Sequence, residues 1–416
     1  MSKLIVNPIE ELNGVVNISG SKNAALPLLS ASLLADGKTV INNLPDLSDI
    51  SVMVEILEML GCKICRQDER ITVDPSLVSP RLLPIDLTGK IRASFLVAGP
   101  LLARFGKADV ALPGGCTIGT RPVDLHLKGF KALGADYVIN DGYVSLFANK
   151  LKGTRIYLDF PSVGATQNIM MASCFAEGTT IIENCASEPE IVNLSDFINK
   201  CGGKISGAGT DKITVDGVGF LKGTEFDVIP DRIEAGTYMI ATAVCGGNVT
   251  ISGVDSSHLT SVTSKLTEIG ISVTENKDTL IINAKGNKKS TDIKTMPFPG
   301  FPTDMQSQFA SLLCNIEGTS VITETIFENR FMYVPELVRM NADIKVDGRT
   351  AVICGKGKLV GAEVTATDLR AGAALLIAGL SAKGKSVINK AEYLNRGYNN
   401  ICEKFAGLGA NMYFDE

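Results

Sequence analysis

Residues 177–184 read "EGTTIIEN", and this pattern of a glycine followed by a β-branched run occurs six times in the chain. The other copies are "DGKTVINN", "FGKADVAL", "GGNVTISG", "EGTSVITE" and "KGKSVINK". The six turn glycines, spaced 66–72 residues apart, are Gly37, Gly106, Gly178, Gly247, Gly318 and Gly384. Self-similarity at a fixed period is typical of a fold built from repeated units.

A second marker follows each of these turns. Its copies are "MLGCKI", "ALGADY", "KCGGKI", "EIGISV", "RMNADI" and "GLGANM", with Gly61, Gly134, Gly202, Gly270, Asn341 and Gly409 at their centres. A helix that ends in this way needs a residue with positive φ, which is glycine or its usual substitute asparagine. The marker therefore predicts a helix C-terminus in every copy.

Each copy predicts the same order of elements. An Ala- and Leu-rich helix precedes the turn glycine, and a β-branched strand follows it. An amphipathic helix such as residues 47–60 then leads to the marker, and short alternating strands such as residues 62–74 come after it. The sequence thus predicts a mixed α/β (α+β) fold of six pseudo-repeats. A solenoid is the alternative, but two helices per unit favour globular domains of three units each.

Composition restricts the classes of function. The 416 residues are 45% hydrophobic and 20% charged, which is typical of a soluble globular protein of two or more domains. A net charge of −5 argues against a nucleic-acid surface, so an anionic ligand would need local arginines and lysines. Neither a secretory signal nor a membrane span is recognisable, which predicts a cytoplasmic protein. The ten cysteines are then expected to be reduced and mostly buried.

Two short motifs suggest functions that their context opposes. "GLSAKGKS", residues 379–386, fits the P-loop pattern, but a helix is expected before it and a strand after it, the reverse of what that loop needs. "CKIC", residues 62–65, has no second cysteine pair, and the chain has only His126 and His258 as further ligands for zinc. Both cysteines are therefore expected in the core or on an edge strand. The remaining cysteines outside the loop described below are expected to be small core residues.

Polar side chains gather at two places in each unit that precede a helix, where free backbone N–H groups favour anions. At the first place they are Lys22, Asn23, Arg92, Ser162, Thr166, Asp231, Arg232, Asp304, Asp368 and Arg370, and at the second they are Cys116, Arg121, Glu188, Glu190, Glu328, Asn329, Arg330 and Arg396. Equivalent places should fall on equivalent faces, so these residues could converge. Ordinary helix capping is the alternative, for Asp304 in particular. His126 also opens a predicted helix, where a structural and a catalytic role are equally compatible with its position.

The second copy is longer than the others between its turn and its marker, with 28 residues against 23–25. The additional residues fall in "LPGGCTIGTRP", residues 112–122, which holds Cys116 between paired glycines and Arg121. A Gly-rich insertion of this kind is a candidate lid. Cys116 could be a small buried residue, a redox thiol or a reacting group.

Several stretches have the character of family motifs: "SGSKNAALP" (19–27), "IRASFLVAGPLLARFG" (91–106), "LPGGCTIGTRPVDLH" (112–126), "SVGATQNIMMA" (162–172), "FPTDMQSQF" (301–309), "TETIFENRFMYVPEL" (323–337), "TDLRAGAALLIAGL" (367–380) and "NRGY" (395–398). Together they resemble the enolpyruvyl transferases that act on UDP-N-acetylglucosamine. The resemblance covers about Lys3 to Met412. It implies two inside-out α/β barrel domains of three units each, with the active site in the cleft between them. One domain would be residues 21–229, with the Cys116 loop, and the other residues 1–20 plus 230–416.

The implied reaction transfers enolpyruvate from phosphoenolpyruvate to the 3-hydroxyl of the sugar and releases phosphate. It opens the committed branch of peptidoglycan synthesis, and fosfomycin, an epoxide that alkylates the reactive thiol, inhibits it. The resemblance implies small-molecule substrates, no cofactor and no metal. It assigns the proton-donating or adduct-forming thiol to Cys116, the phosphoenolpyruvate contacts to Lys22, Arg121, Arg370 and Arg396, and the base for the sugar hydroxyl to Asp304. Contacts to UDP-N-acetylglucosamine fall on Asn23, Arg92, Arg121, Pro122, Val123, Asp124, Leu125, Ser162, Val163, Gly164, Asp304 and Ile326, with Asp368 and Arg330 in support.

Two positions depart from the pattern of that family. Phe160 and Pro161 stand before "SVGAT", where some members have a lysine, and Leu96 stands where some have tryptophan. Both changes are expected to affect substrate affinity rather than the chemistry. Three alternatives stay open: a 3-phosphoshikimate enolpyruvyl transferase, which shares the fold and chemistry, an RNA-end cyclase built from related repeats, and a non-catalytic regulatory paralogue. The acidic chain and its two histidines oppose the cyclase.

Overall fold

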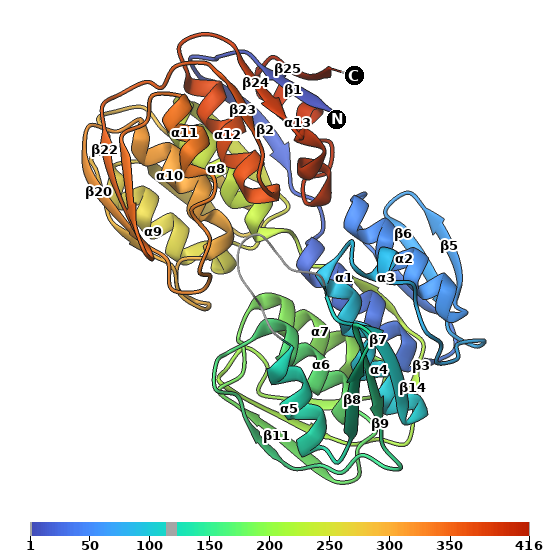
Figure 1. Ribbon diagram of the computed structural model, residues 1–416. Helices are drawn as coiled ribbons and strands as arrows, with labels where there is room; N and C mark the ends of the chain where they lie inside the picture. Colours follow the sequence, from blue (N-terminus) through green and yellow to red (C-terminus); the bar gives the residue numbers. More distant parts are fainter. Residues whose placement is uncertain (1, 114–122, 416) are drawn as a thin grey trace. The chain divides into compact units, whose positions relative to one another are not determined.

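The computed structural model describes residues 2–113 and 123–415, which form two compact units (Figure 1). Unit A comprises residues 20–113 and 123–229, and unit B comprises residues 2–19 and 230–415. The chain leaves unit B after Ser19 and returns to it after Ile229.

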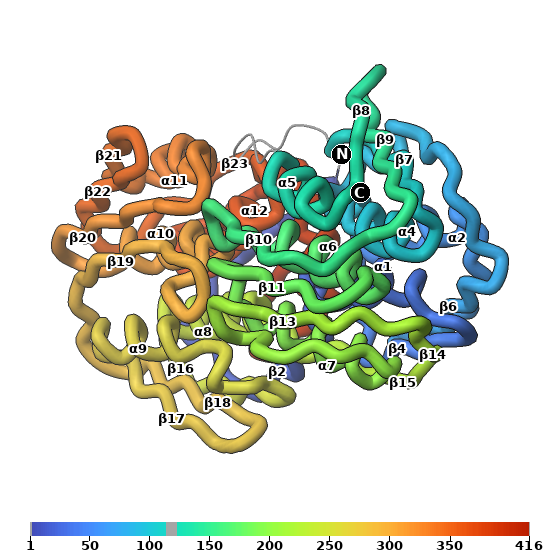
Figure 2. Tube along the Cα trace, turned by 90° about the horizontal axis from the view of Figure 1, so that it is seen from below, coloured from blue at the N-terminus to red at the C-terminus, as the bar shows by residue number. Residues whose placement is uncertain are grey.

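Among the described residues of unit A, three sheets contain three or four strands each. Their strand orders are β15 (Glu225–Asp227), β4 (Thr39–Asn42), β6 (Arg70–Asp74), β5 (Lys63–Gln67); β7 (Lys107–Ala111), β9 (Tyr143–Phe147), β8 (Asp136–Asn140); and β10 (Arg155–Tyr157), β11 (Thr179–Glu183), β13 (Lys212–Asp216), β12 (Lys204–Ser206). A short pair, β14 (Leu221–Lys222) and β3 (Ala35–Asp36), completes the unit. Figure 2 shows β10, β11 and β13 side by side.

Unit B has three four-stranded sheets in the part of the chain that the structure describes. Their strand orders are β2 (Leu12–Asn17), β16 (Gly247–Ser252), β18 (Thr279–Asn283), β17 (Ser272–Asn276); β19 (Ile293–Lys294), β20 (Gly318–Thr323), β22 (Thr350–Gly355), β21 (Ile344–Asp347); and β23 (Glu363–Thr365), β24 (Ser386–Asn389), β1 (Lys3–Val6), β25 (Met412–Asp415). In this unit, the strand after each turn glycine pairs parallel with one neighbour and antiparallel with the other. The N-terminal strand β1 therefore lies between two strands from the end of the chain.

The helices connect these strands. In unit A they are α1 (Lys22–Ala31), η1 (Ser32–Leu34), α2 (Ser48–Leu60), α3 (Ile85–Thr88), η2 (Arg92–Val97), α4 (Ala98–Phe105), α5 (Asp124–Ala132), α6 (Val163–Ser173) and α7 (Pro189–Lys200). In unit B they are α8 (Arg232–Cys245), η3 (Ser256–Leu259), α9 (Thr260–Ile269), η4 (Thr303–Met305), α10 (Gln306–Cys314), α11 (Val334–Arg339), α12 (Leu369–Ser381), η5 (Ala391–Arg396) and α13 (Ile401–Ala406). Elements labelled η are 3₁₀ helices.

Helices fill the interior of unit B, and sheets surround them (Figure 1). Helix α12 is buried from Arg370 to Ser381, because a helix that is apolar on every side must be enclosed. It packs against α8 and α10. Glycine permits the close approach of neighbouring elements: a Cβ at Gly236 on α8 would lie 2.2 Å from the sulfur of Met305. This contact holds the η4 turn against α8.

The backbone confirms the predicted turns. All six turn glycines have positive φ, from 65° at Gly106 to 120° at Gly318. All six marker residues do too, including Asn341 at 70°. Helix α12 precedes the P-loop-like stretch and β24 follows it, so the interpretation against a nucleotide loop is confirmed. None of the helices formed by the described residues is both long enough and apolar enough to span a membrane.

Most of the cysteine predictions hold as well. Cys62 is buried and Cys65 is exposed on the edge strand β5, as predicted. Cys174, Cys185, Cys201 and Cys314 are buried, and burial raises the pKa of each thiol to about 11 or 12. Cys245 and Cys402 are half-buried and still pack against the core of unit B, whereas the prediction was wrong for Cys354, which is half-buried on β22 and is not part of that core.

Candidate active site

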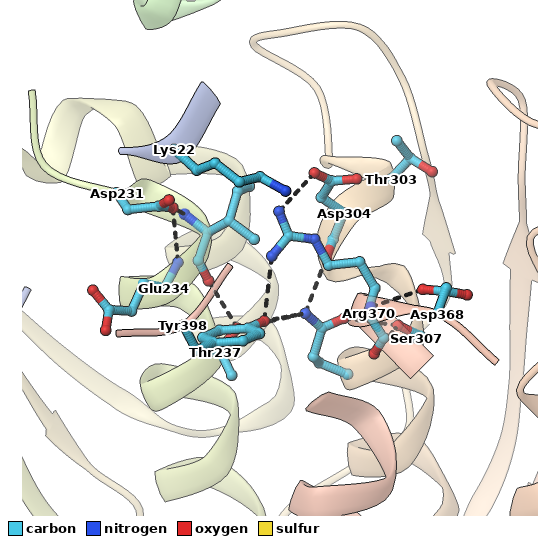
Figure 3. A network of polar contacts seen from close by, with 12 residues as sticks. Lys22, Asp231, Glu234, Thr237, Thr303, Asp304, Ser307, Asp368, Arg370 and Tyr398 are labelled. Carbon is cyan, nitrogen blue, oxygen red and sulfur yellow. Dashed lines mark hydrogen bonds and ion pairs between the residues drawn. The ribbon is translucent and has the colours of Figure 1, made fainter. Parts of the chain in front are cut away.

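Asp304 is held between two arginines in unit B. Its Oδ1 accepts a hydrogen bond from Arg330 Nη2 at 3.0 Å, and its Oδ2 accepts one from Arg370 Nη2 at 2.9 Å. The alternative of a plain N-cap is wrong, because Asp304 lies inside the η4 turn and Pro302 occupies its N-cap position. The carboxylate is thus fixed by long-range ion pairs and not by its own helix, and Figure 3 shows its contact with Arg370.

The two arginines are buried more deeply than the carboxylate. Their side chains are 3% and 6% exposed, whereas that of Asp304 is 29% exposed. Burial opposes the charge of Arg370, but Asp304, Tyr398 and Asp231 raise its pKa above the ordinary arginine value. The carboxylate of Asp304 is therefore partly exposed, and two buried arginines hold it in place. In this position it can accept a proton from a bound hydroxyl group.

The backbone around Arg370 is fixed by two further side chains. Asp368 is the N-cap of α12, and its Oδ1 accepts the N–H groups of Arg370 at 2.7 Å and Ala371 at 3.1 Å. Ser307 on α10 donates its hydroxyl to the carbonyl of Arg370 at 3.0 Å. Asp368 thus supports the site through the start of the helix that carries Arg370.

A buried ion pair marks the start of α1 in unit A. Lys22 Nζ lies 3.2 Å from Asp49 Oδ2, and the two side chains are only 12% and 8% exposed. Asp49 belongs to the first turn of α2, so two helix N-termini meet at this pair. Asp49 was missed from the sequence, although it precedes a helix body as the other polar residues do.

The starts of α5 and α6 also meet in unit A. Val123 is the N-cap of α5, Asp124 and Leu125 lie in its first turn, and Ser162 is the N-cap of α6. His126 joins the two, because its Cε1 and Nε2 would lie 3.2 and 3.3 Å from a Cβ at Gly164, closer than ordinary contact. Only glycine leaves this space open beside the histidine ring.

The protonation of His126 follows from Asn168 on α6. The Oδ1 of Asn168 accepts the N–H of Gly99 at 2.8 Å, so its Nδ2 is the donor to Phe95 O at 2.9 Å and to His126 Nδ1 at 3.0 Å. Nδ1 is then an acceptor, and the proton sits on Nε2, on the side of Gly164. Burial, assisted by Arg92, lowers the pKa of His126 to about 3, so the ring is a neutral donor.

This geometry predicts a specific dependence of stability on pH. Because the pKa of His126 is lower in the folded chain than its ordinary 6.5, the unfolded chain binds more protons below pH 6.5 and stability falls as the pH falls. We expect His126 to remove about 2 kcal/mol between pH 7 and pH 5. Urea unfolding at both pH values should show this loss in the wild type and a smaller one in His126→Gln. Equal losses would contradict the assignment.

The remaining predicted residues are placed individually. Asn23 is half-buried on α1, Arg92 opens η2, Val163 opens α6 and Arg396 ends η5. Ile326 follows β20, and its N–H donates to Glu324 Oε1 at 2.8 Å. Cys116, Arg121 and Pro122, together with the predicted lid, lie outside the described residues. Besides Asp49, Gln308 and Tyr398 were missed, although Gln308 stands one helical turn after Asp304 and Tyr398 stands two residues after Arg396.

Comparisons with known proteins agree over nearly the whole chain. Residues 6–405 match the family described as EPSP synthase (3-phosphoshikimate 1-carboxyvinyltransferase). The chain is 53% identical, over 99% of both sequences, to UDP-N-acetylglucosamine 1-carboxyvinyltransferase 1 of Caldanaerobacter subterraneus subsp. tengcongensis. It is 51% identical, over 99% of its own length and 100% of the other, to UDP-N-acetylglucosamine 1-carboxyvinyltransferase 2 of Clostridium tetani.

Solved structures show the same fold. The crystal structure of the enolpyruvyl transferase NikO from Streptomyces tendae has a TM-score of 0.90 and 26% sequence identity, covering 100% of this chain and 99% of that one. An EPSP synthase from Acinetobacter baumannii has a TM-score of 0.79 and 19% identity, covering both chains fully. At 19% identity, the similarity to the EPSP synthase from Acinetobacter baumannii shows a common fold and nothing about activity.

Proposed function

The chain belongs to the EPSP synthase family of enolpyruvyl transferases, and we propose that it transfers the enolpyruvyl group of phosphoenolpyruvate to the 3-hydroxyl of UDP-N-acetylglucosamine. Phosphate is the second product. The identity of 51–53% to full-length relatives named for this reaction carries the assignment. In the cell, this would be the cytoplasmic reaction that opens the committed branch of peptidoglycan synthesis.

The fold fits this proposal at the level of domains. We infer that unit A and unit B correspond to the two inside-out α/β domains of the family, residues 21–229 and residues 1–20 plus 230–416. The six turn-and-marker copies would then supply three units to each domain. The corresponding strand orders of the five four-stranded sheets and the positive φ angles at equivalent glycines support this inference.

Binding of phosphoenolpyruvate requires concentrated positive charge, because the substrate carries a carboxylate and a phosphate. We assign this task to Lys22, Arg121, Arg370 and Arg396. Arginine suits it because its planar fork meets both anions through two parallel hydrogen bonds. The buried contacts of Arg370 with Asp304 and of Lys22 with Asp49 fix both cations before substrate arrives.

Binding of the sugar nucleotide would use groups that are mostly neutral. The helix start at Ser162, Val163 and Gly164 offers backbone N–H groups to the diphosphate, and its N-terminal dipole favours the negative charge. Arg121, Pro122, Val123, Asp124 and Leu125 are assigned to the uridine side. Asn23, Arg92 and Ile326 complete the proposed contacts, with Ile326 at the acetamido group.

The proposed chemistry is an addition followed by an elimination. Asp304 takes the proton of the 3-hydroxyl, the oxygen bonds to C2 of phosphoenolpyruvate, and Cys116 delivers a proton to C3, which becomes a methyl group. The resulting tetrahedral ketal still carries phosphate. Loss of a proton from the methyl group and of phosphate from C2 restores the double bond in the product. Arg330, Arg370 and Asp368 support this step by holding Asp304 and its neighbours.

One assay tests the proposal against its alternatives. Phosphate release from phosphoenolpyruvate is measured with UDP-N-acetylglucosamine and, separately, with shikimate 3-phosphate as acceptor. We expect phosphate release with UDP-N-acetylglucosamine as the acceptor and none with shikimate 3-phosphate. Release only with shikimate 3-phosphate would favour the sister enzyme, and no release with either acceptor would favour a non-catalytic paralogue.

The reactive thiol can be tested by replacing it with another acid. Cys116→Asp keeps a group that donates a proton but is a poor target for alkylation. We expect this variant to turn over, with an optimum moved to lower pH, and to resist the epoxide fosfomycin, which inactivates the wild type. Steady-state rates from pH 5 to 9 and inactivation rates give both results. Normal alkylation of the variant, or no turnover at any pH, would reject the proton-donor role.

A further inference from the structure

The hydroxyl of Tyr398 lies at the centre of a buried network in unit B. The side chain is 2% exposed, and its oxygen is 3.0 Å from Thr237 Oγ1, 3.2 Å from Gln308 Nε2 and 3.4 Å from Arg370 Nη1. Three elements far apart in the sequence, α8, α10 and α12, each contribute one of these partners. Figure 3 shows Tyr398 between Thr237 and Arg370.

The direction of each hydrogen bond can be derived from Thr237. The Thr237 hydroxyl has a single hydrogen, which it donates to the carbonyl of Ile233 at 2.8 Å. Its oxygen must therefore accept from Tyr398, and the single hydrogen of the phenol is used in that bond. The lone pairs of the phenol oxygen are then left to accept from Arg370 and from Gln308.

The amide of Gln308 agrees with this assignment. Its Nε2 lies 2.9 Å from the carbonyl oxygen of Asp304, which can only accept, so Nε2 is the donor there and toward Tyr398 at 3.2 Å. Gln308 thus links the phenol to the backbone of the proposed base. Arg370 links the same phenol to the carboxylate of that base.

We propose that Tyr398 is a positioning residue, which acts through Arg370 and fixes the rotation of its guanidinium group. With Nη1 on the phenol oxygen and Nη2 on Asp304, the guanidinium plane is set by two contacts, one at each terminal nitrogen. The other N–H groups of the Arg370 guanidinium then point in one fixed direction, in which they can donate to a bound anion. This inference rests on the proposed function, in which that anion is the carboxylate of phosphoenolpyruvate.

Other buried phenols in this unit show that the fold does not require such a bond. Among the described residues, the hydroxyls of Tyr238 and Tyr333 are fully buried and have no hydrogen-bond partner. Tyr238 packs its ring against Phe405, at 4.8 Å between centroids. The three bonds at Tyr398 are therefore a property of its place beside Arg370, and Tyr238→Phe is a matched control for Tyr398→Phe.

The kinetic test compares these two variants in the phosphate-release assay. Removing the acceptor from a charged, buried donor should raise the KM for phosphoenolpyruvate about 5–30-fold in Tyr398→Phe. The KM for UDP-N-acetylglucosamine should stay within about twofold, and Tyr238→Phe should match the wild type in both constants. A lower kcat with both KM values unchanged would indicate a purely structural role and overturn the proposal.

A second pair of variants covers the case in which Tyr398→Phe fails to fold. Thr237→Val removes the acceptor of the phenol hydrogen while keeping the side-chain shape, and Thr237→Ser restores that acceptor. We expect Thr237→Val to raise the KM for phosphoenolpyruvate and Thr237→Ser to return it to within about threefold of the wild type. Equal constants in Thr237→Val and the wild type would overturn the proposal.

A measurement without substrate separates this inference from the proposed function. In arginine-labelled protein, the guanidinium signals of Arg370 are assigned by their absence in Arg370→Lys, and the exchange of its Nη groups by rotation is followed by NMR. Rotation should be slow in the wild type and in Tyr238→Phe, and faster in Tyr398→Phe. A wild type that releases no phosphate would reject the proposed function, whereas unchanged rotation in Tyr398→Phe would reject the positioning role.

Discussion

Replacing Asp304 by asparagine is expected to lower kcat by about 10²–10⁴-fold, the usual effect of removing a general base. The amide has nearly the shape of the carboxylate, but it cannot take a proton from the sugar hydroxyl. It also presents an NH₂ group to one of the two arginines that now donate to Asp304. The measurement is steady-state phosphate release at saturating concentrations of both substrates.

A matched carboxylate outside the site provides the control. Asp292 also accepts a hydrogen bond, from the N–H of Val321 at 2.7 Å, and it makes no hydrogen bond or ion pair with the site residues in the described part of the chain. Asp292→Asn should keep a normal rate, and Asp304→Asn should bind UDP-N-acetylglucosamine within a few-fold of the wild type by calorimetry. A kcat for Asp304→Asn within tenfold of the wild type would refute the role as base.

Replacing Lys404 by methionine is expected to lower the free energy of unfolding by about 3–5 kcal/mol, as for other broken buried ion pairs. Lys404 Nζ lies 2.6 Å from Glu234 Oε1, and the two side chains are 18% and 2% exposed. Methionine keeps the apolar stem but leaves the carboxylate of Glu234 uncompensated. The N–H of Ser19 donates to Glu234 Oε2 at 2.8 Å, and the variant keeps this hydrogen bond.

The sign of the pH dependence gives this prediction a second test. Burial raises the pKa of Glu234, and Lys404 opposes that rise, so the pKa should rise further in Lys404→Met. A carboxyl with a higher pKa in the folded than in the unfolded chain loses stability as the pH rises. The deficit of Lys404→Met in urea unfolding should therefore be larger at pH 8 than at pH 5.

An exposed ion pair is the control for this experiment. Lys128 Nζ lies 2.7 Å from Asp159 Oδ2, with side chains 45% and 69% exposed. Lys128→Met should change the free energy of unfolding by less than about 1 kcal/mol, because water screens the pair. If Lys404→Met lowers the free energy of unfolding no more than Lys128→Met does, the prediction is refuted, because the charge of Glu234 is then stabilised without Lys404.

The backbone of this protein was predictable from the sequence because its signals are local. A glycine or asparagine with positive φ marks each of the six repeated turns and each of the six marker positions, as at Gly61 and Asn341. The run of small apolar residues in α12 indicates a helix buried on all sides. Such features depend only on residues that are close together in the chain, so they can be recognised in a single sequence.

The partners of the site residues were not predictable in the same way. The position of Asp304 near a helix start suggested a cap, whereas its actual partners, Arg330 and Arg370, stand 26 and 66 residues away. Tyr398 and Thr237 are separated by 161 residues. No local pattern specifies such pairs, because they arise only when helices pack. The sequence therefore indicated which residue types gather at the site, but not which atoms meet.

The place of β1 has a consequence for synthesis on the ribosome. Among the described strands, residues 3–6 pair with residues 386–389 and 412–415, so this strand is synthesised long before its partners. At about 5–20 residues per second, it waits on the order of 20–80 seconds for its partners. The residues of unit A are all synthesised by Ile229, well before that. The nascent chain thus reaches its native state by closing a covalent loop between β1 and the distant strands β24 and β25.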